Sequence, residues 1–157
     1  MSEAATPEQN QPTFNIEKLY VKDMSLEVPH APSIYLEREV PEIDMQLHTE
    51  FSAIDEGIFE VVITSTLTAK MNSVKDKVMF LIEVKQAGVF HVRNIPEGEM
   101  ESVLAVVCPN ILYPYLREVV TDLSVRGGFA PVLLNPVNFE ALYKQQKAQE
   151  SADVTKH

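Results

Sequence analysis

Four histidines and one cysteine are the side chains whose types could support catalysis or metal binding. No pair of histidines has the i, i+4 spacing that places two metal ligands on one helix face. The histidines are His30, His48, His91 and His157. Cys108 stands beside a proline in an apolar stretch, which favours a buried structural thiol over a nucleophile. No nucleotide-binding glycine loop or serine-hydrolase motif is found. We therefore expect no catalytic residue, no metal and no cofactor, and a protein that is not an enzyme.

Charge is the next chemical feature, and it is acidic. The 157 residues include 23 acidic and 13 basic side chains, for a net charge of −10. This balance argues against binding to nucleic acid or to an anionic membrane surface. Ten of the acidic residues fall between Asp23 and Glu60, with Arg38 as the basic residue among them. Two interpretations remain open: a solvated surface, or a docking face for a basic partner.

The cysteine count and the apolar runs bear on the compartment. A single cysteine cannot form an intrachain disulfide, which fits a reducing compartment. The N-terminus lacks a basic segment followed by an apolar run, and the uninterrupted apolar runs are shorter than the ~20 residues of a membrane span. These features predict a cytoplasmic protein.

Alternating apolar and polar residues predict strands in the first part of the chain. The predicted strands cover residues 13–29, 42–51, 58–70 and 78–92. Short turns between the last three favour an antiparallel sheet. Phe14 and Ile16 are out of phase with Leu19 and Val21, which predicts a bulge in the first strand, and Gly88 predicts another irregularity.

Helical spacing follows the strands, which indicates an α+β fold. We expect a long helix over residues 98–126 and a short second helix over 136–146, with Asn135-Pro136 at its start. Pro109 and Pro114 should break or kink the long helix. The folded domain is predicted to cover residues 13–143.

The two ends of the chain are polar and lack periodicity. Residues 1–12 are predicted to be a flexible leader, and residues 147–157 a flexible tail.

Apolar residues exceed what one sheet face needs. They continue around the long helix and reappear in the loop at Ile34 to Leu36. They could be sheet-on-helix core, or they could form an oligomer interface and a binding groove. The stripe residues expected at an oligomer interface are Val103, Leu104, Val107, Ile111, Tyr115 and Val119.

Five segments occur in a characteristic order and spacing: residues 20–32, 80–90, 108–118, 126–129 and 134–143. They closely resemble the bacterial SecB family of protein-export chaperones, and the resemblance covers about Thr13 to Tyr143. It implies a homotetramer built as a dimer of dimers, with sheet edges paired within a dimer and long helices packed between dimers.

The resemblance also implies a function. Such proteins are ATP-independent holdases that keep newly made secretory precursors unfolded and deliver them to the translocase ATPase SecA. The contact with SecA would involve its basic, zinc-bearing C-terminal tail. The alternative is a chaperone of the same fold dedicated to a toxin–antitoxin partner.

Site residues can be carried over from the family by position. Alternation places the residues that match SecA-contact positions on the sheet face opposite the apolar rows; they are Asp23, Glu27, Leu81 and Glu83. The residues expected near the substrate groove are Ile34, Tyr35, Phe139, Leu142 and Tyr143. Ile43, Met45 and Leu47 also match substrate-linked positions, although periodicity alone assigns them to the core. Glu39 stands where close relatives can carry a large aromatic residue, so groove chemistry near it is expected to differ.

Overall fold

The first half of the chain forms one antiparallel sheet. The computed structural model describes residues 11–75 and 77–155. The strands are β1 (Thr13–Glu27), β2 (Glu42–Asp55), β3 (Ile58–Lys70) and β4 (Val78–Arg93). Their spatial order is β1-β4-β3-β2, and every neighbouring pair is antiparallel. The predicted α+β fold with a four-stranded sheet is confirmed, although β1 ends two residues earlier and β2 four residues later than predicted.

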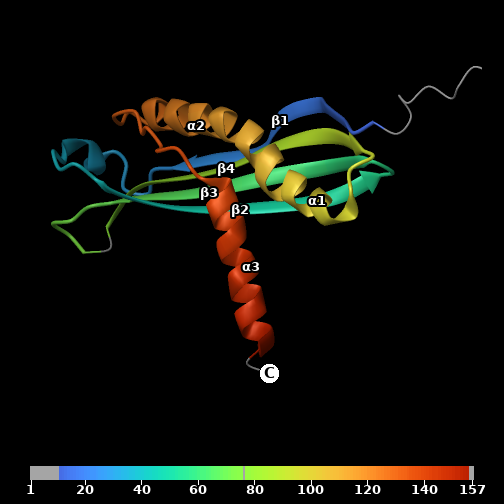
Figure 1. The fold of residues 1–157 in the computed structure, drawn as a ribbon. Coiled ribbons are helices and arrows are strands. Elements are labelled where there is room, and N and C mark those ends of the chain that lie inside the picture. Colours follow the sequence, from blue (N-terminus) through green and yellow to red (C-terminus); the bar gives the residue numbers. More distant parts are fainter. Residues whose placement is uncertain (1–10, 76, 156–157) are drawn as a thin grey trace, which may run out of the picture.

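Strand order determines the course of the connecting loop. Because β1 and β2 lie at opposite edges of the sheet, residues 28–41 must cross one end of it. This crossing contains a short 3₁₀ turn, η2 (Ser33–Leu36). Figure 1 shows the loop at the end of the sheet, beside the end of α2.

Bulges in β1 explain its mixed periodicity. The register shifts between Ile16 and Lys18 and again near Val21. The bulge after Ile16 adds one residue to β1. Ile16 therefore pairs with Phe90 and Leu19 with Gly88, so both lie on the same face of the sheet although they are three residues apart. The predicted irregularity therefore lies in β1.

Gly88 was predicted to mark a bulge or bend, but it lies in the unbroken strand β4 without a register shift, so a bulge there is wrong. A Cβ at Gly88 would lie 2.7 Å from the Phe90 ring and 3.1 Å from Leu112. The glycine therefore makes room for these side chains.

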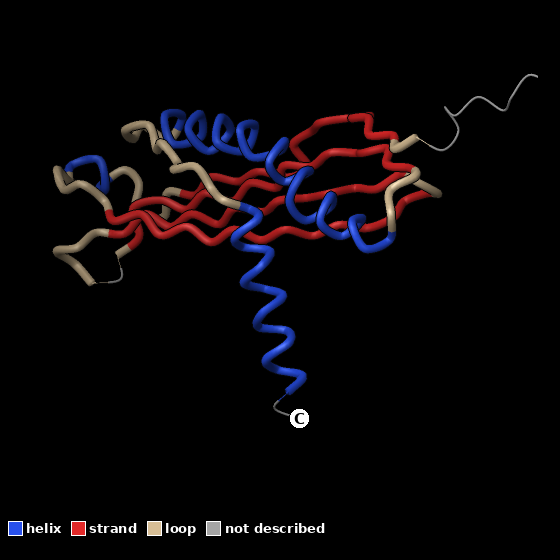
Figure 2. Tube along the Cα trace, viewed as in Figure 1, coloured by secondary structure: helices blue, strands red, loops and turns tan. Residues whose placement is uncertain are grey.

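One face of the sheet carries a long, bent helical segment (Figure 2). It consists of α1 (Glu97–Ser102), a π-helical turn η3 (Val103–Val107) and α2 (Cys108–Arg126). Figure 1 shows that the axis changes direction between α1 and α2. The π turn directly precedes Pro109, whose ring conflicts with the carbonyl four residues earlier in a regular helix. The predicted kink thus lies upstream of Pro109, and α2 continues through Pro114 without a break.

The helical segment supplies a substantial part of the core. It is 30 residues long and, by length and composition alone, apolar enough to cross a membrane. In the fold, however, its apolar stripe packs against the sheet, as in a core helix. The stripe residues that are almost completely buried are Leu104, Cys108, Leu112, Leu116, Val120 and Leu123.

After α2 the chain turns back beside the helix. The hydroxyl of Thr121 donates to the carbonyl of Val132 at 2.6 Å, and the amide of Val132 donates to Ser124 Oγ at 3.0 Å. These bonds hold an extended segment along α2. It leads to the last helix, α3 (Phe139–Thr155).

Both predicted limits of the last helix are wrong. It begins at Phe139, and the Asn138 side chain accepts a hydrogen bond from the Ala141 amide at 3.0 Å, so Asn138 is the cap. The Asn135 carbonyl instead accepts a hydrogen bond from the Tyr113 hydroxyl. Residues 147–155, predicted as flexible tail, are helical, while most of the predicted leader lies outside the described residues.

Candidate functional site

The sheet register gathers the four predicted SecA-contact residues on one face. Glu27 lies directly opposite Leu81, and Glu83 lies opposite the residue midway between Asp23 and Glu27. Alternate residues of β4 point into the helix-covered core, so these four side chains lie on the other face. We call Asp23, Glu27, Leu81 and Glu83 the acidic face.

Two lysines near the acidic face have different surroundings. Lys85, which was not among the predicted site residues, lies opposite Asp23. Lys22 Nζ lies 2.8 Å from Glu60 Oε1, and Glu60 also accepts a hydrogen bond from the Tyr20 hydroxyl. The hydrogen bond from Lys22, and then that from Tyr20, lowers the pKa of the Glu60 carboxyl. The charge of Lys22 is thus directed toward Glu60.

The pKa of the Tyr20 phenol is raised by burial and by the Glu60 carboxylate. Burial first, and then the hydrogen bond to Glu60, raises the pKa of the Tyr20 phenol to about 12. The phenol therefore stays protonated near neutral pH.

The predicted groove residues line three neighbouring cavities. The first, of about 290 Å³, lies between the connecting loop and residues 128–132. Tyr35 is 45% exposed there and stacks on Phe129 with ring centroids 5.5 Å apart. Phe129 stacks in turn on Phe80 at 4.3 Å. Ile34 is only 1% exposed, so it forms part of the buried floor of this cavity and belongs to the core.

The second cavity, of about 490 Å³, is lined by Ile43 and Met45 on one side and residues 130–137 on the other. It shares Val40 and Pro41 with the first cavity. The two therefore form one continuous groove.

Periodicity and the family resemblance are both consistent with the position of β2. Ile43, Met45 and Leu47 pair with β3 residues of the helix-facing side. They remain partly exposed because β2 is the edge strand.

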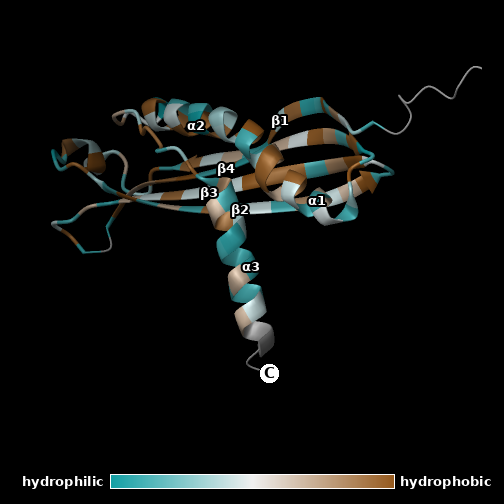
Figure 3. Cartoon of the chain, viewed as in Figure 1, coloured by the Kyte–Doolittle hydropathy of each residue, from teal (hydrophilic) through white to brown (hydrophobic). Residues whose placement is uncertain are grey.

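The third cavity, of about 270 Å³, extends the line of cavities to α3. Leu47 of β2 and Leu142 and Tyr143 of α3 line it. Phe139 is 3% exposed and packs edge-on against Tyr113, with ring centroids 5.7 Å apart, so it supports the cavity from the core. Beyond its first turns, α3 is largely hydrophilic and projects away from the sheet (Figure 3).

The residues predicted for an oligomer interface are divided between η3 and α2, and they differ in exposure. Val107 and Tyr115 are 43% and 49% exposed. Val103, Ile111 and Val119 are partly buried against the core. Leu104 is a core residue that faces the sheet, so this assignment was wrong.

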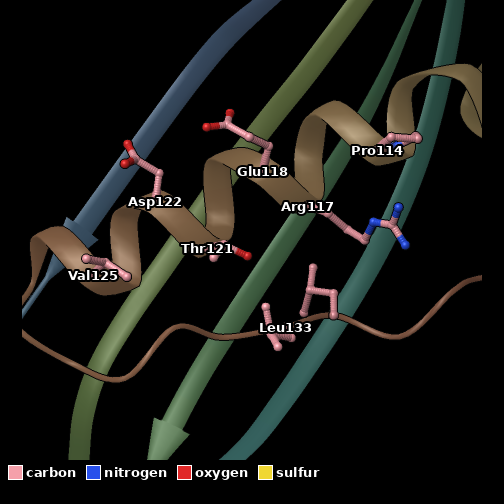
Figure 4. A pocket seen from close by; sticks show the side chains of 8 residues that line it. Pro114, Arg117, Glu118, Thr121, Asp122, Val125 and Leu133 are labelled. Carbon is pink, nitrogen blue, oxygen red and sulfur yellow. The ribbon is translucent and has the colours of Figure 1, made fainter.

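Sequence reasoning missed a larger hollow beside this face. A cavity of about 580 Å³ lies between α2 and the returning segment, and Figure 4 shows Leu133 across from Arg117 and Thr121. Leu133 is 79% exposed. The sequence signal that could have indicated an exposed apolar residue here is the position of Leu133 in a loop, two residues after Pro131. Its lining residues are Pro114, Arg117, Glu118, Thr121, Asp122, Val125, Leu133 and Leu134.

The side chains considered first for catalysis are dispersed. Within residues 11–75 and 77–155, no group of three histidine, cysteine or carboxylate side chains converges to hold a metal. Cys108 is completely buried, and burial raises the pKa of its thiol to about 12, so the thiol stays protonated near neutral pH.

Comparisons with known proteins agree with one another. A family model described as "SecB: Preprotein translocase subunit SecB" matches residues 7–150. The "Protein-export protein SecB" of Nitrosospira multiformis is 62% identical over 142 residues, covering 90% of this chain and 87% of that protein. The protein of the same name from Nitrosomonas europaea is 59% identical over 147 residues, covering 94% and 91%.

The fold also occurs in a solved structure. A SecB-like chaperone of Mycobacterium tuberculosis, in complex with a peptide from an antitoxin, superposes with a TM-score of 0.64 at 21% identity. The match covers 79% of this chain and 90% of that one.

Proposed function

This chain belongs to the SecB family, and from that membership we propose that it is an ATP-independent holdase for protein export. It binds unfolded secretory precursors in the cytoplasm, keeps them competent for translocation and delivers them to SecA. Identities of 52–62% to proteins named as protein-export proteins favour this function over a chaperone dedicated to a toxin–antitoxin partner.

The observation that carries the proposal is the line of apolar cavities from the connecting loop to α3. Exposed aromatic and aliphatic side chains line the cavities from Tyr35 through Ile43 to Leu142. An extended, non-native chain can place successive apolar side chains along such a groove, whereas a folded protein has buried them. Binding the unfolded chain alone withdraws it from folding by mass action, so no catalytic residue is required.

Delivery to SecA is assigned to the acidic face. Leu81 is a partly exposed apolar residue between carboxylates, which suits a partner segment that combines basic charge with an apolar contact. We assign it to the basic, zinc-bearing C-terminal tail of SecA. The zinc belongs to that partner.

The oligomer is a homotetramer, built as a dimer of dimers. The exposed residues Val107 of η3 and Tyr115 of α2, with the mixed polar and apolar hollow beside Leu133, provide a surface for a neighbouring subunit. The outer edges of β1 and β2 have no partner strand within the described sheet, so they are available for pairing between chains.

A refolding assay tests the function. An unfolded precursor is diluted from denaturant with and without equimolar tetramer, and recovery of its native fluorescence is followed. We expect the wild type to slow refolding, and Ile43→Glu and Leu142→Glu to weaken this effect because each places a charge in the groove. Glu56→Lys, in the exposed β2–β3 turn, is the control.

Two further measurements complete the test. Light scattering should give the mass of four chains, and a pulldown from the source cytoplasm should return SecA with unprocessed precursors. A monomer that leaves refolding rates unchanged would contradict the proposal, and recovery of one toxin–antitoxin system in place of SecA would support the alternative.

A further inference from the structure

The wall of the groove is an irregular segment that is nevertheless held at both ends. We call residues 36–41, which run from the last residue of η2 to the start of β2, the rim segment. Leu36 and Val40 are each 81% exposed, so the segment has little packing of its own. Val40 and Pro41 line both the first and the second cavity. The position of the rim segment therefore sets the width of the groove.

The end next to η2 is fixed to the end of α2. The Tyr35 hydroxyl donates to the Gly127 carbonyl at 2.7 Å, and its ring stacks on Phe129. This contact holds the residue before the rim segment against the opposite wall of the first cavity.

The end next to β2 is fixed by a carboxylate. Glu39 Oε1 accepts hydrogen bonds from the backbone amides of Asn72 at 2.8 Å and Ser73 at 2.9 Å. Glu39 Oε2 accepts a further bond from the Ser73 hydroxyl. Consecutive backbone amides that converge on one oxygen form a cradle for an anion, and Glu39 occupies it. The rim segment is thus attached to the β3–β4 turn.

These bonds belong to the ionised form of Glu39. The hydrogen bond from the Ser73 hydroxyl, assisted by the two amides, lowers the pKa of the carboxyl. Glu37, two residues away, lines the same cavity, but no side-chain hydrogen bond to the turn is observed for it in the described part of the chain. Glu37 and Glu39 are both carboxylates beside this cavity, but only Glu39 is hydrogen-bonded to the β3–β4 turn in the described residues. Glu37 is therefore a matched control for substitution of Glu39.

We propose that Glu39 is a positioning residue of the client groove, because its carboxylate attaches the rim segment to the β3–β4 turn and so holds the shared wall of two cavities in place. The inference rests on the proposed holdase function and identifies a residue that determines the groove's shape. A wall ordered in advance loses less conformational entropy when a client binds. Releasing it lowers affinity, chiefly by accelerating dissociation.

The experiment compares Glu39→Gln with Glu37→Gln in the full-length protein. The probe is reduced, carboxamidomethylated α-lactalbumin, a chain that stays unfolded, and its dissociation constant and dissociation rate are measured by fluorescence. Hydrogen exchange of the Asn72 and Ser73 amides is measured in the absence of the probe. Ser73→Ala is made alone and together with Glu39→Gln.

We expect Glu39→Gln to raise the dissociation constant roughly three- to tenfold, with faster exchange at both amides, since it removes charge-assisted hydrogen bonds. Glu37→Gln should change neither value. Ser73→Ala should have a smaller effect in the same direction, and it should add little in the Glu39→Gln background because the two groups share one contact.

Contrary outcomes separate the two proposals. Equal client affinity for Glu39→Gln and Glu37→Gln, with the wild type binding the probe, overturns the role of Glu39 alone. Weaker binding without faster exchange at Asn72 and Ser73 overturns it as well. Should Glu39→Gln fail to fold, unaltered binding by Ser73→Ala overturns it. A wild type that does not bind the probe overturns the holdase function itself.

Discussion

The two faces of the sheet differ although the same strands form both. On β4, Ile82 is 1% exposed beneath the helices, while its neighbour Glu83 lies on the acidic face. The core face is covered by α2, and the acidic face has no helix over it in the described residues (Figure 1). We therefore assign stability to the β4 residues that face the core, such as Ile82, and docking to those on the acidic face, such as Glu83. Substitutions at neighbouring positions should separate the two properties.

The largest expected difference is between Ile82→Ala and Leu81→Ala. The first removes buried methyl groups and should lower the free energy of unfolding by about 2–5 kcal/mol. Leu81 is partly exposed, so Leu81→Ala should lower the free energy of unfolding by about 1 kcal/mol or less. The same substitution should weaken SecA binding. Urea unfolding and a SecA binding assay measure both effects. Similar destabilisation by the two variants would contradict the assignment of faces.

Charge reversal on the acidic face is expected to have the next largest effect. Asp23→Lys and Glu83→Lys should weaken SecA binding about tenfold or more, or ~1.4 kcal/mol, and reduce its dependence on salt. The tetramer and client binding should persist. Glu56→Lys makes the same charge change in the exposed β2–β3 turn and is the control. Unchanged, salt-insensitive binding by the reversed variants would show that SecA docks elsewhere.

A smaller effect is expected from neighbouring residues of β3. Ser65 is completely buried on the core face, and its hydroxyl has no hydrogen-bond partner among the described residues. Ser65→Ala should therefore raise the free energy of unfolding by about 1 kcal/mol. Thr66→Ala, on the exposed face, should change it by less than about 0.5 kcal/mol. Thermal and urea unfolding measure both, and a destabilised Ser65→Ala would indicate that the buried hydroxyl makes a stabilising hydrogen bond inside the fold.

The smallest effect concerns pH on the uncovered face. Because the pKa of Glu60 is lowered in the folded state, its contacts with Lys22 and Tyr20 stabilise the fold above the ordinary value of 4.5. That contribution should disappear as pH falls through the lowered pKa. The stability difference between wild type and Glu60→Gln, measured in urea from pH 7 to pH 3, should be constant at first and then shrink. A difference of equal size at both ends would exclude a role for ionisation.

Much of the sheet could be predicted from local patterns. Alternation placed Glu83 and Ile82 on opposite faces because side chains of a strand point alternately to its two sides. The phase change between Ile16 and Leu19 correctly indicated a bulge in β1. The position of a residue along its strand was sufficient to predict which face of the sheet its side chain occupies, because every second side chain points to the same face.

Other features could not be predicted because they depend on contacts distant in sequence. Leu104 and Val107 belong to one apolar stripe, and only the packing of the helix on the sheet makes the first core and the second exposed. The π turn before Pro109 shifts the helical phase, which a regular 3.6-residue repeat does not anticipate. Asn135-Pro136 has the composition of a helix start, but the hydrogen bond from Tyr113 to the Asn135 carbonyl accompanies an extended segment that continues to Asn138.

The groove shows most clearly which features follow from sequence patterns and which depend on tertiary packing. Residue patterns along the chain were enough to predict the four strands, the helices that follow them and the family, and they show which residues are apolar. Tertiary packing alone makes Ile34 a core residue and leaves Tyr35 open, and it puts Ile43 on the core side of an uncovered edge. It also brought Glu39 to Ser73, 34 residues away. Local preferences act between near neighbours, whereas these arrangements follow from which edge each strand occupies and what packs over it.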